Sequence, residues 1–253
     1  RGATCSDRQL DLEYAECFSV DHYDGGYSLI TVKDDARYLV VPENASVPDG
    51  LDADIVVLQQ PLDSIYLVSS SVMDQFVALD ALDSIALSGT KQDGWYIDEA
   101  KQAMADGKIT YAGKYSAPDY ETIYSADCNL AIENTMIYHT PEVKEQLEKL
   151  GIPVFVERSS YEPHALGRME WIKLYGVLTG KEEQAEALYD EQLDALAPIL
   201  DRPSTARPPH SSISRRTAQQ MCANPPIMSQ KCSSLPEESI SSTTSPTTTP
   251  ARP

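Results

Sequence analysis

The strongest constraint on the fold is the alternation of short apolar runs with helical patterns between residues 54 and 157. Runs that are apolar throughout and rich in β-branched residues are typical of strands buried on both faces of a parallel sheet. Helices between them provide the crossover connections that parallel strands need. The pattern predicts an α/β fold with strands at 54–58, 65–68, 84–87, 108–112, 129–132 and 152–157, and helices at 72–82, 97–105, from 118 onward and at 143–150.

The flanking segments complete the expected organisation. Residues 27–41 have the pattern of a β-hairpin with a charged turn. From Leu166 a long amphipathic stretch runs to Leu200, with an interruption expected near Gly176 and Gly180. We therefore expect an N-terminal extension (1–26), an N-terminal α/β lobe with a leading hairpin (27–162), a long helix (163–200) and a tail (201–253).

The composition changes abruptly near Asp201, after which Pro, Ser, Thr and basic residues dominate and no Phe, Tyr or Trp occurs. Such a segment buries too little apolar surface to offset its ordering entropy, so we expect disorder. One interpretation is a natural Ser/Thr/Pro-rich linker. The other, which we favour, is a frameshift near residues 202–204. Codons for residues 206–244 can be chosen so that the frame one base earlier encodes strand-like and helix-like segments.

Charge and motif content exclude several function classes. A net charge of −19 repels phosphate and anionic lipid, which argues against a nucleic-acid partner. No run approaches the roughly 18 apolar residues of a membrane span. The four histidines do not lie at metal-ligand spacing, so we expect no metal site. The G-x-S-x-G, H-E-x-x-H and G-x-G-x-x-G motifs are absent, and we expect no enzymatic activity.

The five cysteines are odd in number and include no C-x-x-C pair, so they define no disulfide framework. Cys5 lies near the start, where a lipidated cysteine would be attractive. The preceding residues 2–4 match the small-apolar lipoprotein box poorly, which favours an ordinary free thiol.

Three stretches carry a characteristic order of motifs: YSAPDYETIYSADCNLAIEN (115–134), TPEVKEQLEKLGIPVFVE (140–157) and WIKLYGVLTGKEEQAEALYDEQLDAL (171–196). This order resembles the periplasmic binding proteins for siderophores, haem and vitamin B12. In that family a short acid-bearing helix precedes a strand, a Gly-I-P-V unit follows a leucine-rich helix, and a helix with L-x-G-K-E-x-x-A bridges two α/β lobes. The resemblance covers roughly residues 50–200, while the leading hairpin departs from the family and indicates a divergent branch.

The resemblance implies the substrate-binding component of an ABC importer, without resident cofactor. It would capture an iron-siderophore-like chelate (a ferric siderophore, haem or a corrinoid) between two lobes and deliver it to a membrane permease with its ATPase. Its location would be the periplasm or the outer face of the cell membrane, with a lipid anchor. Residues 27–162 would then be the first lobe, 163–200 the interlobe helix and 201–253 a wrong-frame translation of the second lobe. We expect such a truncated chain to bind ligand weakly or not at all.

Ligand contacts are expected on loops that follow the carboxyl ends of the strands. Ser70, Ser71 and Met73 follow the strand at 65–68, with helix capping and core packing as the alternatives. Trp95 and Tyr115 lie in loops where an aromatic side chain suits a flat chelate. Hydrophobic anchoring of the loops is the alternative for both.

The last two strands are followed by polar residues in the same way. Glu133 and Thr135 come after 129–132, and Arg158 and Tyr161 come after 152–157. A cation such as Arg158 in so acidic a chain predicts an anionic ligand, with a salt bridge as the alternative. Glu121 matches the acid by which the family docks onto its permease, and it could equally be a solvated acid in the first turn of a helix.

Two other functions stay open at this point. A single-lobe adhesive or scaffold domain on a Ser/Thr/Pro stalk requires the tail to be genuine. A hydrolytic enzyme would need Asp119 and Glu121 to act as general acid and base. Turnover would identify the enzyme, whereas saturable chelate binding without turnover would identify the transport protein.

Overall fold

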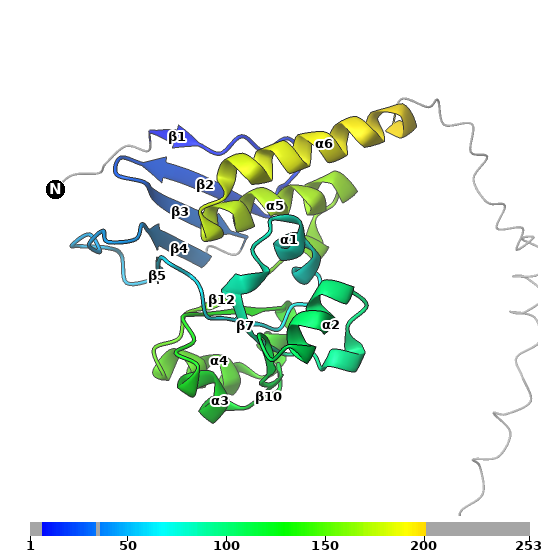
Figure 1. Cartoon of the computed structure of the whole chain (residues 1–253). Coiled ribbons are helices and arrows are strands. Elements are labelled where there is room, and N and C mark those ends of the chain that lie inside the picture. The colour runs from blue at the N-terminus through cyan, green and yellow to red at the C-terminus, as the bar shows by residue number, and fades with distance from the viewer. Residues whose placement is uncertain (1–6, 34–35, 201–253) are drawn as a thin grey trace, which may run out of the picture. The chain divides into compact units, whose positions relative to one another are not determined.

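The computed structural model describes residues 7–33 and 36–200, which build two five-stranded β-sheets, one two-stranded sheet and the helices that pack around them (Figure 1). Cys5 and the tail from residue 201 lie outside these residues. The frameshift hypothesis concerns that tail and therefore also falls outside them.

The parallel five-stranded sheet formed by residues 65–156, called sheet B below, confirms the predicted α/β class. Its strands lie in the order β12-β11-β6-β7-β8, and all neighbours are parallel. Every residue of β6, β11 and β12 is buried, which explains why the sequence shows continuous apolar runs there. The strands are β6 (Ile65–Leu67), β7 (Ile85–Ser88), β8 (Thr110–Tyr111), β11 (Leu130–Glu133) and β12 (Val154–Val156).

Sheet A is built from the N-terminal part of the chain. Its strands, in spatial order, are β1 (Arg8–Gln9), β2 (Phe18–Tyr23), β3 (Tyr27–Val32), β4 (Ala36–Val41) and β5 (Ile55–Gln59). The expected hairpin at 27–41 is confirmed as the antiparallel pair β3–β4. The segment 1–26, expected as an N-terminal extension with no element assigned to it, contributes β1 and β2. A second difference is that β5 pairs in parallel with β4 and does not join sheet B.

The helices of the described chain are short except for the last two. They are α1 (Met73–Ala78), α2 (Asp98–Ala105), α3 (Tyr120–Ser125), α4 (Pro141–Lys149), α5 (Ala165–Thr179) and α6 (Glu182–Leu200). Single 3₁₀ turns lie at η1 (Leu82–Ser84), η2 (Gln92–Gly94), η3 (Thr135–His139) and η4 (Ser159–Tyr161), and a small hairpin joins β9 (Gly113–Lys114) to β10 (Ala117–Pro118).

The long helix expected at 163–200, with an interruption near Gly176 and Gly180, is a helical hairpin of α5 and α6. Gly180 adopts a left-handed φ of 70° and ends α5, and α6 then returns alongside it (Figure 1). The pairing is close, because a Cβ added at Gly176 would lie 2.6 Å from the Cβ of Ala185. One turn further, Lys173 Nζ lies 4.5 Å from the centroid of the Tyr189 ring.

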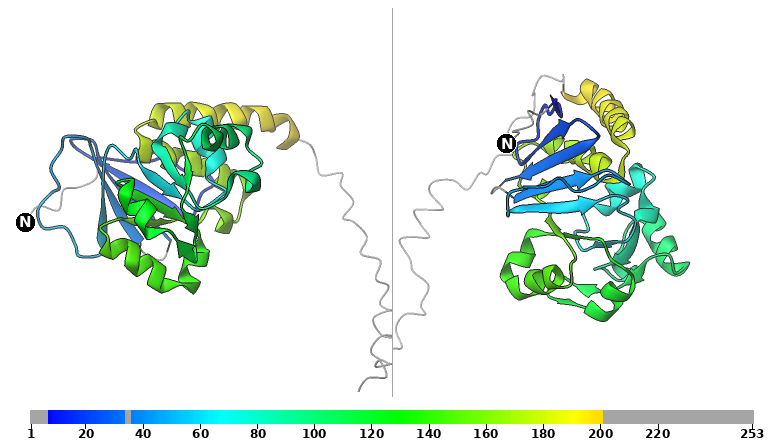
Figure 2. Two further views of the ribbon diagram at one scale, coloured as in Figure 1. Left: turned by 60° about the horizontal axis from the view of Figure 1, so that its bottom comes forward. Right: turned by 90° about the vertical axis from the view of Figure 1, so that its left-hand side faces the viewer.

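The two faces of sheet B belong to different cores. On one face, Ile65, Leu67 and Phe155 join a cluster that also contains the inner face of sheet A and the buried side of α5. On the other face, Tyr66 and Ala131 join a smaller cluster with residues of α3 and α4. Figure 2 shows the helices α3 and α4 on the side of sheet B away from α5 and α6.

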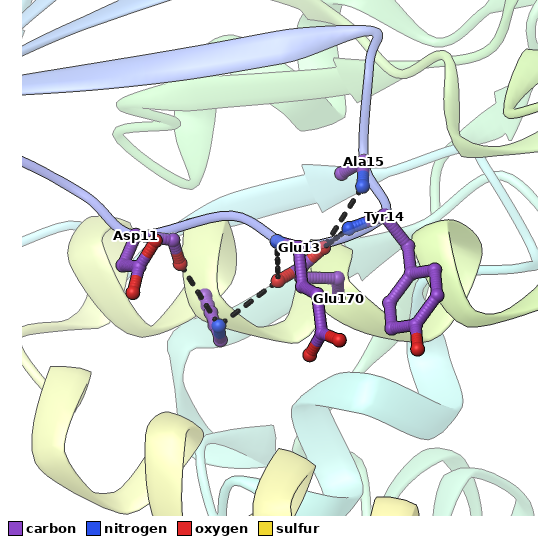
Figure 3. A network of polar contacts seen from close by, with 6 residues as sticks. Asp11, Glu13, Tyr14, Ala15 and Glu170 are labelled. Carbon is purple, nitrogen blue, oxygen red and sulfur yellow. Dashed lines mark hydrogen bonds and ion pairs between the residues drawn. The ribbon is translucent and has the colours of Figure 1, made fainter.

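Two buried acids fasten residues 13–17 to the start of the helical hairpin. Glu170 on α5 accepts hydrogen bonds at 2.8–2.9 Å from the backbone N–H groups of residues 13–15 (Figure 3). Glu162, just before α5, accepts those of residues 16 and 17 at 2.8 and 3.0 Å. Lys173 donates to Glu170 and to the carbonyl oxygen of Asp11. The N-terminal segment is thus a fixed part of the lobe.

A candidate ligand site at the carboxyl edge of sheet B

The strand order of sheet B brings three polar loops together. Strands β12, β11 and β6 are neighbours and parallel, so the loops that follow them meet at one edge of the sheet. We call this surface the carboxyl edge and define it by residues 69–71, 133–138 and 157–161. It unites most of the residues that the sequence singled out, because open parallel sheets expose their loops at this end.

Arg158 forms the centre of the exposed part of this edge. Its guanidinium carbon lies 5.5 Å from the ring centroid of Tyr138 and 5.7 Å from that of Tyr161, within reach of cation–π attraction. The Tyr161 hydroxyl lies 3.1 Å from Thr135 Oγ1. Both tyrosine rings remain about half exposed, at 50% and 55%. The structure therefore brings Thr135, Arg158 and Tyr161 together on one surface, where one cation lies beside two aromatic rings.

Tyr138 is a member that sequence reasoning missed. It lies on η3, which Asn134 begins by accepting a hydrogen bond from the N–H of Met136. The pattern of residues 134–140 gave no sign of a 3₁₀ turn. Only that turn directs the Tyr138 side chain toward the loop after β12.

A chain of hydrogen bonds links the loops after β6 and β12. Glu157 is buried, and its Oε1 accepts from the N–H of Ser159 at 2.6 Å. Its Oε2 accepts from the Ser69 hydroxyl at 3.1 Å, and Ser69 Oγ lies 3.0 Å from Ser71 Oγ. Ser71 and Ser70 are exposed. Ser70 and Ser71 therefore belong to the exposed part of the carboxyl edge, and Glu157 is a further member that the sequence did not single out.

Glu133 is the most unusual group of the carboxyl edge. Its side chain is 0% exposed, and neither carboxyl oxygen has a hydrogen-bond partner among the described residues. Loss of hydration raises its pKa to about 8, because burial penalises the charged form. It lies two residues after Ala131 on β11 and therefore on the same α3–α4 face of the sheet, where its charge would act on Tyr66 and Tyr120.

Two expected ligand residues are core residues instead. Met73 is 0% exposed and packs in the larger core. Trp95 is 4% exposed, and its Nε1 donates to the Ser88 hydroxyl at 3.2 Å. Met73 faces the core from the first turn of α1, and Trp95 faces it from the loop after η2, which are the alternatives stated for each. Tyr115 is half buried against the smaller core.

The remaining sequence expectations concern α3, partners and metals. Asp119 begins α3 by accepting the N–H of Thr122, which leaves Glu121 exposed in the first turn. Within the described ranges, no group of three or more His, Cys, Asp or Glu side chains could hold a metal ion. None of the described helices is both long and apolar enough to cross a membrane.

A hollow of about 730 Å³ lies at the opposite end of sheet B. It is lined by α2 and by residues that precede β7 and β8, among them Leu82, Asp98 and Lys108. Amino-terminal edges of parallel sheets rarely carry ligand sites, and the polar groups of this hollow are ordinary exposed helix residues. The carboxyl edge is the better candidate.

The chain is similar over part of its length to several solved structures, with TM-scores below 0.5. A periplasmic haem-binding protein from Pseudomonas aeruginosa is 19% identical, with 64% of this chain and 47% of that chain covered and a TM-score of 0.43. An ABC-type Fe³⁺-hydroxamate transport protein from Saccharomonospora viridis is 21% identical over 55% of this chain and 50% of that chain, with a TM-score of 0.42. A petrobactin-binding protein from Bacillus subtilis is 14% identical over 54% and 45%, with a TM-score of 0.43.

Two curated relatives come from Methanocaldococcus jannaschii, and both are described as uncharacterized lipoproteins. One is 22% identical over 180 residues, covering 66% of this chain and 42% of the relative. The other is 25% identical over 180 residues, covering 70% and 45%. The chain thus spans less than half the length of these relatives. No family model matches the chain, and these comparisons give no support to the frameshift hypothesis.

Proposed function

We propose that this chain is the ligand-binding lobe of an extracytoplasmic substrate-binding protein of an ABC importer. Its ligand would be an anionic, iron-siderophore-like chelate that is handed to a membrane permease. The observation that carries the proposal is that the Arg158 guanidinium lies within 5.7 Å of the ring centroids of both Tyr138 and Tyr161, at the carboxyl edge of a parallel sheet.

The charge balance supports an anionic ligand. The chain has 39 acidic and 20 basic residues, so a cation set between two half-exposed rings stands out against its surroundings. A guanidinium binds carboxylate or catecholate oxygens through charge-assisted hydrogen bonds. The ring faces of Tyr138 and Tyr161 would stack on planar parts of the same molecule. Capture of such a ligand needs no bond chemistry, which agrees with the lack of recognisable catalytic motifs.

Location and partners follow from the sequence motifs and from the relatives. The motif order in residues 115–196 is that of importer binding proteins, and both curated relatives are described as lipoproteins. We infer an extracytoplasmic, lipid-anchored protein that docks onto its permease through Glu121. This side chain is exposed at the start of α3, where an acid can steer the approach of a basic partner.

A titration of the ¹⁵N-labelled chain with the gallium(III) complex of 2,3-dihydroxybenzoate tests the proposal. This complex is an anionic, diamagnetic substitute for a ferric catecholate. Because the chain spans less than half of its relatives, we expect weak but saturable binding, with amide shifts confined to residues 69–71, 133–138 and 157–161. Arg158→Gln should weaken binding roughly tenfold or more, the loss expected for a charge-assisted hydrogen bond.

Arg168→Gln is the matched control. Arg168 is exposed and donates to the carbonyl oxygen of Ser160, so its loss removes the same charge close to the site but outside the tyrosine pair. We expect it to leave the affinity within about twofold, as for an exposed surface substitution. Equal affinities of wild type and Arg158→Gln, or no saturable shift with this complex or with haemin, would contradict the proposal.

A further inference from the structure

The hydrogen-bond chain at the carboxyl edge has a direction. The Ser69 hydroxyl donates to Glu157 Oε2 at 3.1 Å, so its proton is committed to that carboxyl oxygen. Ser69 Oγ then interacts with Ser71 through its lone pairs, at 3.0 Å. The Ser71 proton must therefore point inward, toward Ser69. The exposed side of Ser71 Oγ is left with lone pairs only.

We infer that Glu157 is a positioning residue that makes Ser71 a hydrogen-bond acceptor, so that the site selects a ligand which donates a hydrogen bond there. This inference rests on the proposed function and narrows its ligand class. Neighbouring strands lie about 4.8 Å apart, and β12 and β6 are separated by β11 alone, so the loops of Arg158 and Ser71 are about 10 Å apart. The preferred ligand is anionic at the Arg158 end and carries an N–H or O–H donor about that distance away.

The polarity of the chain can be reversed by one isosteric substitution. In Glu157→Gln the amide oxygen must stay with the N–H of Ser159, which can only donate. The amide NH₂ then faces Ser69 and donates to its oxygen. The Ser69 hydroxyl then donates its hydrogen bond to Ser71 Oγ, and the Ser71 hydroxyl hydrogen points to solvent. The variant should therefore present a donor where the wild type presents an acceptor.

Neutron diffraction from deuterated crystals locates the Ser71 hydroxyl deuteron and so measures the direction of this hydrogen bond without any ligand. In the wild type we expect the Ser71 deuteron on the line to Ser69 Oγ, and in Glu157→Gln we expect it to point to solvent. Ser69→Ala is the second variant, in which the Ser71 deuteron has no inward acceptor and should also point outward. A wild-type Ser71 deuteron that points away from Ser69 overturns the inference.

A pair of isosteric probes tests the ligand preference in solution. One is a benzoate that carries a distal pyrrole N–H, a pure donor, and the other is the corresponding furan, a pure acceptor. We expect wild type to favour the pyrrole probe about fivefold, the net worth of one hydrogen bond, and Glu157→Gln to lose or invert that preference. If Glu157 has a merely structural role, Glu157→Gln should bind both probes more weakly by the same factor. That result would overturn the inference. Failure of both probes to bind, with the deuteron pointing inward, would count against the proposed function and not against the polarity of Ser71.

Discussion

Replacing Glu170 by alanine should lower the free energy of unfolding by about 4 kcal/mol. The carboxylate is 0% exposed and accepts three backbone N–H groups at 2.8–2.9 Å, from Glu13, Tyr14 and Ala15. It also accepts from Lys173 Nζ at 2.9 Å (Figure 3). Removal leaves three donors without that acceptor and a nearly buried ammonium without its counter-charge. Hydrogen bonds to charged groups contribute about 1.5–3 kcal/mol each, and their sum is reduced because they share one acceptor.

Thermal and urea unfolding measure this loss. A cost of about 4 kcal/mol corresponds to a fall in Tm of roughly 8–16 °C for a chain of this size. Glu191→Ala, which removes an exposed acid from α6, is the control and should stay within about 0.5 kcal/mol of wild type. A Glu170→Ala variant whose unfolding free energy lies within about 1 kcal/mol of wild type would refute the account of residues 13–17 as a segment fixed by this carboxylate.

The same network predicts a component of acid unfolding. Burial alone would raise the pKa of Glu170, but the hydrogen bonds from Glu13, Tyr14, Lys173 and Ala15 outweigh it and hold the pKa below its ordinary value. The folded state therefore binds its proton at lower pH than the unfolded state. The stabilisation is present above the ordinary glutamate pKa of about 4.3 and is lost as the pH falls through the lower folded-state pKa. Glu170→Gln should lack this loss.

Two further substitutions test the interior. Because the pKa of Glu133 is raised to about 8, the folded state keeps a proton that the unfolded state releases, and stability should decline as the pH rises from about 4.3 to about 8. Glu133→Gln should remove that decline and raise the unfolding free energy at pH 7 by about 3 kcal/mol; an unchanged pH profile in urea titrations would contradict this. Gly176→Ala should destabilise the helical hairpin by about 1–3 kcal/mol, since its Cβ would lie 2.6 Å from Ala185. Ala187→Ser on the exposed side of α6 is its control. If Gly176→Ala melts at the same temperature as wild type, α5 and α6 are not packed so closely.

Local patterns predicted most elements and missed those whose signals depend on partners. The six expected strands all occur, and the continuous apolar runs of β6, β11 and β12 belong to strands that are buried on both faces. Strand β2 was overlooked although Gly25 and Gly26, with φ of 83° and 84°, form a hairpin turn between two alternating runs. The reversal at Gly180 was expected only as an interruption, since amphipathicity is the same for one long helix and for two that pack together.

The candidate site was predictable in part for the same reason. Arg158 and Tyr161 could be named because they follow a buried strand, whereas the contribution of Tyr138 depends on a 3₁₀ turn that leaves no clear pattern. Trp95 also follows a strand, yet its loop folds inward and the indole N–H binds Ser88 in the core. Position after a strand thus selects an edge of the sheet and does not fix the direction of a side chain.

The sequence by itself determined the α/β class, the positions of the strands and the acidity of the chain, because periodicity and charge are carried by neighbouring residues. Only the tertiary structure decided that β12, β11 and β6 are adjacent, and with that order which loops meet. It also decided that Glu157 is bonded to Ser69 while Glu133 has no polar partner among the described residues. Burial and hydrogen-bond partnership depend on segments distant in the chain, so two glutamates that look alike in the sequence acquire opposite chemical roles in the fold.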